Sequence, residues 1–290
     1  MPEFWESVRL RFLNRKSRAN DGAELYLSGL DRNIRINTWH GVFNIAALDI
    51  VIPFTSIFAM KLGASAFEVA LLSSAPAAVS LVAMIPGAHF IDRSDRKKRL
   101  TFLFMLAHRI FYLALTCVPF FAPSRRTLIF VVLIAIMNFP GAISNVAWQS
   151  LISKIIPPER RAEAFAARNK IMNVVGTAVT LMAGLALDRM AFPLGYQIIF
   201  GIAFVLALIE LKVFNSLDES VTRQEPAAVP LEPAHGVPEQ STLKQRLAAI
   251  FKEKRFVRYT LASILFYFGW QIAWPLFNWY QVKELGANNV

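Results

Sequence analysis

Long apolar runs separated by short polar connectors dominate this chain. The runs are long enough to cross a bilayer as helices, at about 20 residues each. The predicted spans cover residues 38–60, 67–91, 100–121, 127–152, 165–187, 193–216 and 257–281. Continuous runs favour helices over barrel strands, because barrel strands alternate between lipid-facing and interior residues. The predicted fold class is therefore all-α, a polytopic membrane helical bundle.

The polar segments divide the chain into four predicted parts. These are a basic N-terminal segment (1–37), a six-span bundle (38–217), a linker (218–256) and the first span of a second bundle (257–290). Four prolines between residues 226 and 238 exclude regular structure from the start of the linker. Residues 243–251 predict a short amphipathic helix. The N-terminal segment fits either a helix on the cytoplasmic membrane surface or a disordered basic tail.

Composition supports a membrane protein. The 290 residues are 55% hydrophobic and 18% charged, whereas a soluble domain has about 25% charged residues. The net charge of +11 could indicate nucleic-acid binding, but the cations follow the predicted topology instead. The N-terminal segment and the polar stretches at 92–99, 153–170 and 212–258 hold 25 lysines and arginines, against five in the other connectors. This bias predicts a cytoplasmic N-terminus in the cell membrane and no nucleic-acid partner.

Asp49 is the sharpest candidate among the polar residues at membrane depth. An ionised carboxylate at mid-bilayer costs about 2.5–3.5 kcal/mol, so such residues usually face a cavity or a partner. Pro53 has no N–H to bond the Asp49 carbonyl, which adds a second polar group nearby. One hypothesis is that Asp49 carries a coupling proton or contacts a cationic substrate. The alternative is a structural kink with a protonated or backbone-bonded carboxyl group.

Arg109 is a second charge at membrane depth. It is predicted to lie within about 3 Å of the depth of Asp49. It could pair with Asp49, bind an anionic substrate or satisfy backbone carbonyls. His40 and Asn44 lie on roughly the opposite side of the first span from Asp49, so these three residues are not expected to share one cavity.

The fourth span carries a polar stripe of Asn138, Asn145 and Gln149 with Ala142 between them. Helical spacing places these residues on one face. The stripe either lines a cavity or makes inter-helix hydrogen bonds, which contribute about 0.6 kcal/mol each. Cavity lining is the favoured interpretation.

A short repeat links the first and seventh spans. Asp49 and Pro53 are followed by Leu62-Gly63-Ala64, and the seventh span has Gln271 and Pro275 followed by Leu285-Gly286-Ala287. The pattern predicts that the seventh span opens a second copy of the first bundle. It also makes Gln271 a candidate for a site at the repeat interface.

The loop after the second span carries the sequence Asp92-Arg93-Ser94-Asp95-Arg96-Lys97, preceded by Ala88. It resembles the motif G-x-x-x-D-R-x-G-R-[RK] of the major facilitator superfamily, with Ala88 and Asp95 in place of the two glycines. Residues 157–164 are similar to that family's P-x-x-R-G element, with alanine for the glycine. The resemblance covers about residues 36–290.

The resemblance implies a secondary transporter that works by alternating access. Asp92 would contact a helix terminus of the second bundle when the cytoplasmic side closes, and Arg93, Arg96 and Lys97 would help to hold that state. The alternative role for these cations is to set topology alone. The resemblance also implies a complete second bundle, so the chain is expected to be a fragment or a truncated form.

The expected function is transport of a small solute, coupled to protons through Asp49, in the lipid bilayer. No G-x-x-x-x-G-K-[ST] loop occurs, so direct ATP use is not expected. No catalytic residues, metal site or cofactor are expected either, because the motifs for them are absent. The alternatives are a membrane-embedded enzyme and a sensory or structural membrane protein that does not transport.

Overall fold

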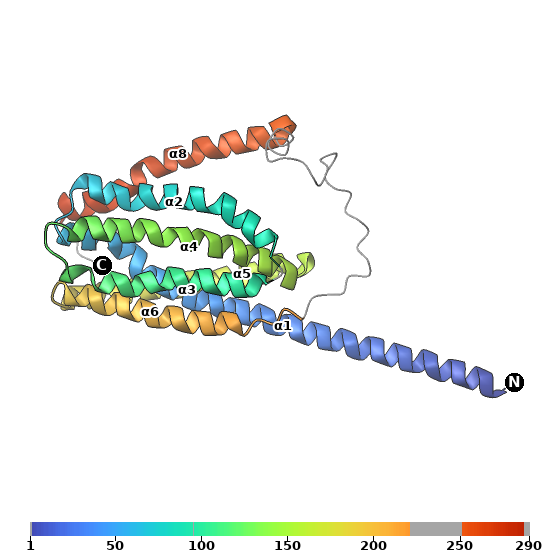
Figure 1. Ribbon diagram of the computed structural model, residues 1–290. Helices are drawn as coiled ribbons and strands as arrows, with labels where there is room; N and C mark the ends of the chain where they lie inside the picture. Colours follow the sequence, from blue (N-terminus) through green and yellow to red (C-terminus); the bar gives the residue numbers. More distant parts are fainter. Residues whose placement is uncertain (1, 95, 221–250, 287–290) are drawn as a thin grey trace. The chain divides into compact units, whose positions relative to one another are not determined.

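The computed structural model describes residues 2–94, 96–220 and 251–286, and every regular element in these ranges is helical (Figure 1). The helices are α1 (Pro2–Lys61), α2 (Ala66–Asp92), α3 (Lys97–Thr116), η1 (Val118–Phe120), α4 (Arg126–Ile155), α5 (Pro158–Arg189), α6 (Leu194–Asn215) and α8 (Lys254–Lys283). Within the described ranges, α1 to α6 are long and apolar enough to span a membrane. The all-α membrane bundle predicted from hydropathy is confirmed.

Helix α8 belongs to a second compact unit of the chain. It is 30 residues long and matches the predicted seventh span. The linker between residues 221 and 250, including most of the predicted amphipathic helix, lies outside the described residues.

Helix α1 begins well before the predicted first span. Helix α1 is continuous through residue 38, and Leu30, Asn33 and Asn37 on one of its faces are buried. Two of these three buried residues are polar, and charged residues occupy the other face of this part of the helix. A hydropathy average over the segment therefore does not detect it. Asn33 is satisfied by Asp218 after α6, since its Nδ2 donates to the Asp218 carbonyl at 2.8 Å and its Oδ1 accepts from the Asp218 N–H at 3.0 Å.

The six spans pack with an internal three-plus-three relation. Helix α1 packs against α5 and α6, and α4 packs against α2 and α3. Helices α3 and α6 pack against each other. If α1, α2 and α3 are exchanged with α4, α5 and α6 respectively, the same set of packed pairs results. This is expected for two three-helix repeats.

Local sequence fixes the connection between α1 and α2. Gly63 follows α1 with φ of +96°, and the N–H groups of Gly63 and Ala64 bond the carbonyls of Met60 and Ala59 at 3.0 and 2.9 Å. This is a Schellman ending, which favours glycine at the left-handed position. Ser65 then caps α2 in a reciprocal capping box with Glu68.

The repeat noted in the sequence has a counterpart in backbone conformation. Gly286, the counterpart of Gly63, follows α8 with φ of +64°. Within the described residues, Gly63 and Gly286 are the two with positive φ. The two segments therefore share a left-handed glycine after the helix as well as a sequence pattern.

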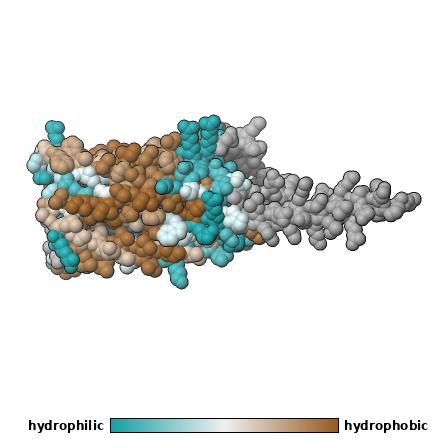
Figure 2. Space-filling view, turned by 90° about the horizontal axis from the view of Figure 1, so that it is seen from below, coloured by the Kyte–Doolittle hydropathy of each residue, from teal (hydrophilic) through white to brown (hydrophobic). Residues whose placement is uncertain are grey.

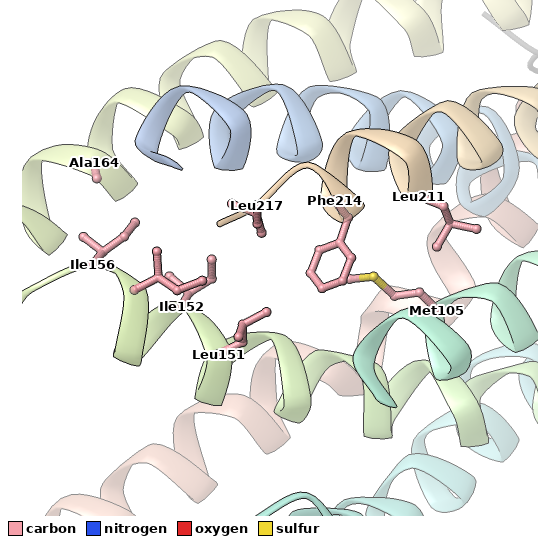
Figure 3. Packing of buried hydrophobic residues seen from close by; sticks show 9 residues of the cluster. Met105, Leu151, Ile152, Ile156, Ala164, Leu211, Phe214 and Leu217 are labelled. Carbon is pink, nitrogen blue, oxygen red and sulfur yellow. The ribbon is translucent and has the colours of Figure 1, made fainter. Parts of the chain in front are cut away.

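One end of the bundle is sealed by a cluster of apolar side chains from α3, α4, α5 and α6 and the turns next to them (Figure 3). Its members are Met105, Leu151, Ile152, Ile155, Ile156, Ala164, Leu211, Phe214 and Leu217. We call this end, which also carries Arg93, Arg96 and Arg161, the basic end. On the face of the bundle in Figure 2, apolar residues form a broad band and hydrophilic residues gather toward its ends, as expected for a membrane-spanning surface.

Candidate functional site

A polar pocket of about 460 Å³ lies among α1, α2, α3, α4 and α5. It is lined by His40, Asn44, Leu48, Ser80, Met84, Met105, His108, Arg109, Asn138, Gly141, Ala142, Ser144, Asn145, Trp148, Arg168 and Met172. Met105 also belongs to the apolar cluster, and Trp148 packs against it. The cluster therefore borders the pocket on the side of the basic end.

Helical periodicity explains how α1 and α4 supply much of this lining. His40, Asn44 and Leu48 are spaced four residues apart on α1, so they share one face. Asn138 and Asn145 of α4, two members of the predicted polar stripe, are among the lining residues. Gln149, at the end of the stripe, is exposed and not among the lining residues.

One of the lining residues, Arg109, forms a buried ion pair with Glu210. Arg109 Nη2 of α3 lies 2.8 Å from Glu210 Oε2 of α6, and both side chains are almost completely buried. The pair joins the two helices that are exchanged by the three-plus-three relation. Arg109 thus has a carboxylate partner, which is Glu210 and not Asp49.

Neighbouring polar groups complete the surroundings of this pair. Asn44 Nδ2 donates to Glu210 Oε1 at 2.8 Å, and His40 Nε2 lies 3.2 Å from the same oxygen. Arg109 Nη1 donates to the Tyr112 hydroxyl at 2.7 Å and lies 3.1 Å from His108 Nδ1. A buried ion pair needs such additional bonds, because its own attraction barely offsets the loss of hydration.

Arg168 of α5 is the second buried cation of the pocket. Its Nε donates to the Asn37 carbonyl of α1 at 3.3 Å, and its guanidinium carbon lies 4.7 Å from the centre of the Trp148 ring. Gly41 leaves room for it, because a Cβ at that position would come within 2.6 Å of Arg168 Nε. In the sequence, Arg168 is one of the cations of the 153–170 stretch and has no feature that marks it as a site residue.

Asp49 lies apart from the pocket, as its angular position on the first span predicts. Its carboxylate faces Gly176 of α5, where an added Cβ would collide with it. The Thr180 hydroxyl donates to the Asp49 carbonyl at 3.4 Å, so a neighbouring helix satisfies the group that Pro53 leaves free. The geometric option of an Asp49–Arg109 pair is not realised.

The remaining sequence candidates lie elsewhere. Gln271 is exposed on α8, in the second unit. Asp92 is the last residue of α2, and its side chain lies outside the described ones. Arg93 and Arg96 are exposed in the turn between α2 and α3. Lys97 Nζ donates to the Ser150 hydroxyl of α4 at 2.9 Å, so this part of the loop is fixed to the bundle.

Arg161 closes the turn between α4 and α5. Its Nε donates to the Ile156 carbonyl at 2.9 Å, and its Nη2 bonds the Ser153 carbonyl. These are carbonyls at the C-terminal end of α4, where a cation is favourable. The arginine of the predicted P-x-x-R element therefore has a structural role as a helix cap.

Comparison with known proteins agrees with this architecture. No curated protein sequence matches the chain. A profile described as Major Facilitator Superfamily matches residues 41–289, which includes the first span from residue 41 onward, the next five spans and α8. The members of that family are membrane transporters, not enzymes. The chain is therefore a multi-pass membrane protein that belongs to the major facilitator superfamily.

Proposed function

We propose that the chain moves a small solute by alternating access and that the pocket is the bundle's share of the solute site. The observation that carries the proposal is a polar pocket, lined from five helices, inside a membrane-spanning bundle. Polar side chains at membrane depth are usually tolerated only where they face each other, a cavity or water.

Proton coupling through Asp49 is the second part of the proposal. Asp49 is partly buried, and among the described residues no cation or hydrogen-bond donor pairs with its carboxylate. When Asp49 is surrounded by hydrocarbon, binding of a proton would neutralise its carboxylate. Its position outside the pocket favours this role over contact with a cationic substrate.

The loop between α2 and α3 is proposed as the gate. Lys97 and Lys98 are bonded to Ser150 and to the Leu217 carbonyl, at 2.9 and 2.6 Å, so they anchor the loop. Arg93 and Arg96 remain exposed and available to a partner surface. Asp92, with these arginines and Lys97, would hold a second bundle against the basic end. We place the basic end and the N-terminus on the cytoplasmic side of the cell membrane.

Proteoliposomes that contain the chain and an internal pH dye test this function. Addition of organic carboxylates, amines and sugars in turn should produce proton movement with at least one class. Asp49→Asn should abolish the proton movement, whereas Thr177→Val, an exposed α5 residue that bonds only its own helix, should leave it unchanged. Solute uptake with the same pH dependence in Asp49→Asn would contradict the coupling role. No uptake of any solute, even with a second bundle supplied in the same proteoliposomes, would contradict transport.

A further inference from the structure

The pocket contains an imbalance of charge. Two arginines, Arg109 and Arg168, are both buried at its wall, and they are 4% and 8% exposed. Arg109 is paired with Glu210. Within the described part of the chain, no carboxylate lies within 4 Å of Arg168. The pair is neutral as a whole, so Arg168 leaves a local excess of positive charge.

The position of Arg168 is built by three helices. The Asn37 carbonyl of α1 accepts a hydrogen bond from its Nε, the Trp148 ring of α4 lies 4.7 Å from its guanidinium carbon, and Gly41 allows α1 to approach it closely. These contacts use one of the five N–H donors of the side chain. The others are available to a molecule in the pocket, which Arg168 helps to line.

A buried cation with no carboxylate in contact is costly, and Glu210, which acts on Arg168 from a longer distance, is already paired with Arg109. A planar carboxylate is well matched to Arg168, because guanidinium can donate two parallel hydrogen bonds to one carboxylate. Apolar lining from Leu48, Met84 and Met172 suits an organic body. The volume of about 460 Å³ is within the range of small-molecule sites.

We propose that the pocket binds a small organic anion and that Arg168 is the direct ligand of its carboxylate group. Trp148 holds the guanidinium in place and packs against the organic part, and Asn145 supplies a polar contact at the α4 wall. The inference deepens the proposed transport function by naming its substrate class, and it rests on the same pocket.

Calorimetric titration of the detergent-purified chain tests the proposal with matched probes. These are benzoate, its neutral counterpart benzamide and the cation benzylammonium. Benzoate should bind at least ten-fold more tightly than either of the others. Arg168→Gln should weaken benzoate at least ten-fold and leave benzamide within two-fold, while Lys170→Gln, which changes an exposed cation of the same helix, should leave all three unchanged.

A measurement on the unaltered chain guards against misfolding of the variant. Phenylglyoxal modifies accessible arginines, and mass spectrometry can locate the modified residue. Benzoate should protect Arg168 from this reagent and benzamide should not, with Arg93 modified equally in both cases. Equal binding of benzoate and benzamide, unchanged benzoate binding in Arg168→Gln or the absence of protection would each overturn the proposal.

The outcomes separate this inference from the function on which it rests. Arg168-dependent binding of benzoate without any solute transport would contradict the transport proposal and leave the anion site standing. Transport confined to amines or sugars would contradict the anion site and leave alternating access standing.

Discussion

The ion pair between Arg109 and Glu210 is the feature with the largest single-residue consequences. Both side chains are almost fully buried, and the pair is supported by the Asn44 amide, which donates to Glu210, and by the Tyr112 hydroxyl, which accepts from Arg109. In such pairs the loss of one partner is far more costly than the loss of both, because it leaves an uncompensated buried charge. The pair therefore fixes how α3 and α6 face each other.

Replacement of one partner should reveal this dependence. Glu210→Gln should lower the free energy of unfolding by about 3–5 kcal/mol, since Arg109 would stay charged and buried. The double change Arg109→Met with Glu210→Leu should recover most of that loss. The measurement is unfolding of the purified chain in mixed micelles of dodecyl maltoside and SDS.

A surface pair provides the matched control. Glu163 lies 3.4 Å from Arg160, but its side chain is 76% exposed. Glu163→Gln should change the unfolding free energy by less than about 1 kcal/mol. A cost for Glu210→Gln as small as that for Glu163→Gln would show that the buried pair contributes no more than a surface one.

The sequence predicts such residues unevenly. Arg109 stands out because it interrupts an apolar run, but Glu210 sits near the end of one, beside Lys212, where a charge is ordinary. Depth along the helices can be estimated from residue number, whereas the side of the helix that a partner occupies depends on packing. The two partners are 101 residues apart in the chain. The helical stripe of α4 was predictable because its members are close in sequence.

At the scale of elements, close approach of α1 and α5 depends on a small residue. Gly176 stands against Asp49 and Ile45, and an added Cβ would lie 3.2 Å from Ile45 Cγ1 and overlap the Asp49 carboxylate. Small residues commonly allow this kind of close contact between membrane helices. The contact also determines the surroundings of the proposed proton carrier.

Gly176→Ala should therefore cost about 1–3 kcal/mol of unfolding free energy through overpacking. It should also displace the Asp49 side chain and alter the pH dependence of uptake. Gly201→Ala is the matched control, because no atom lies within 4 Å of its added Cβ, and it should be neutral or slightly stabilising. Micelle unfolding of both variants decides the point, and equal stability of Gly176→Ala and the unaltered chain would contradict the close packing.

The hydropathy pattern predicts where most helices lie but not how they continue past the apolar part. Helices α2 and α4 agree with their predicted spans to within three residues at each end. Helix α5 begins at Pro158, well before the predicted residue 165, because its first turns are polar and lie at the basic end. Hydropathy reports contact with lipid, whereas helix ends are set by caps such as Ser65 and by prolines.

At the scale of the whole molecule, the two ends of the bundle differ in charge, and this predicts orientation. Cys117 is exposed just after α3, at the opposite end of that helix from the basic loop. A cytoplasmic N-terminus would place Cys117 outside the cell, because three spans precede it. An impermeant maleimide should therefore label intact cells that express the chain.

Two variants make the labelling test specific. Cys117→Ser should remove the label, since the chain has one cysteine. Glu159→Cys in that background places a thiol on an exposed position at the basic end, and it should react only after the cells are permeabilised. Labelling of Glu159→Cys in intact cells, together with no labelling of Cys117 in the unaltered chain, would show the opposite orientation.

The continuous helix α1 is longer than the hydrocarbon layer of a bilayer is thick, so one end of it extends beyond the membrane. From Tyr26 to Lys61 it spans 36 residues, or about 54 Å, against about 30 Å of hydrocarbon. Asn33 clamps it to the chain after α6 beyond the apolar core, so the overhang turns with the bundle as a lever arm. A tilt of about 10° about the Lys61 end of the helix would move residue 26 by about 9 Å, given that length. A spectroscopic label near that residue would thus magnify rocking of the bundle that is hard to detect at the pocket itself.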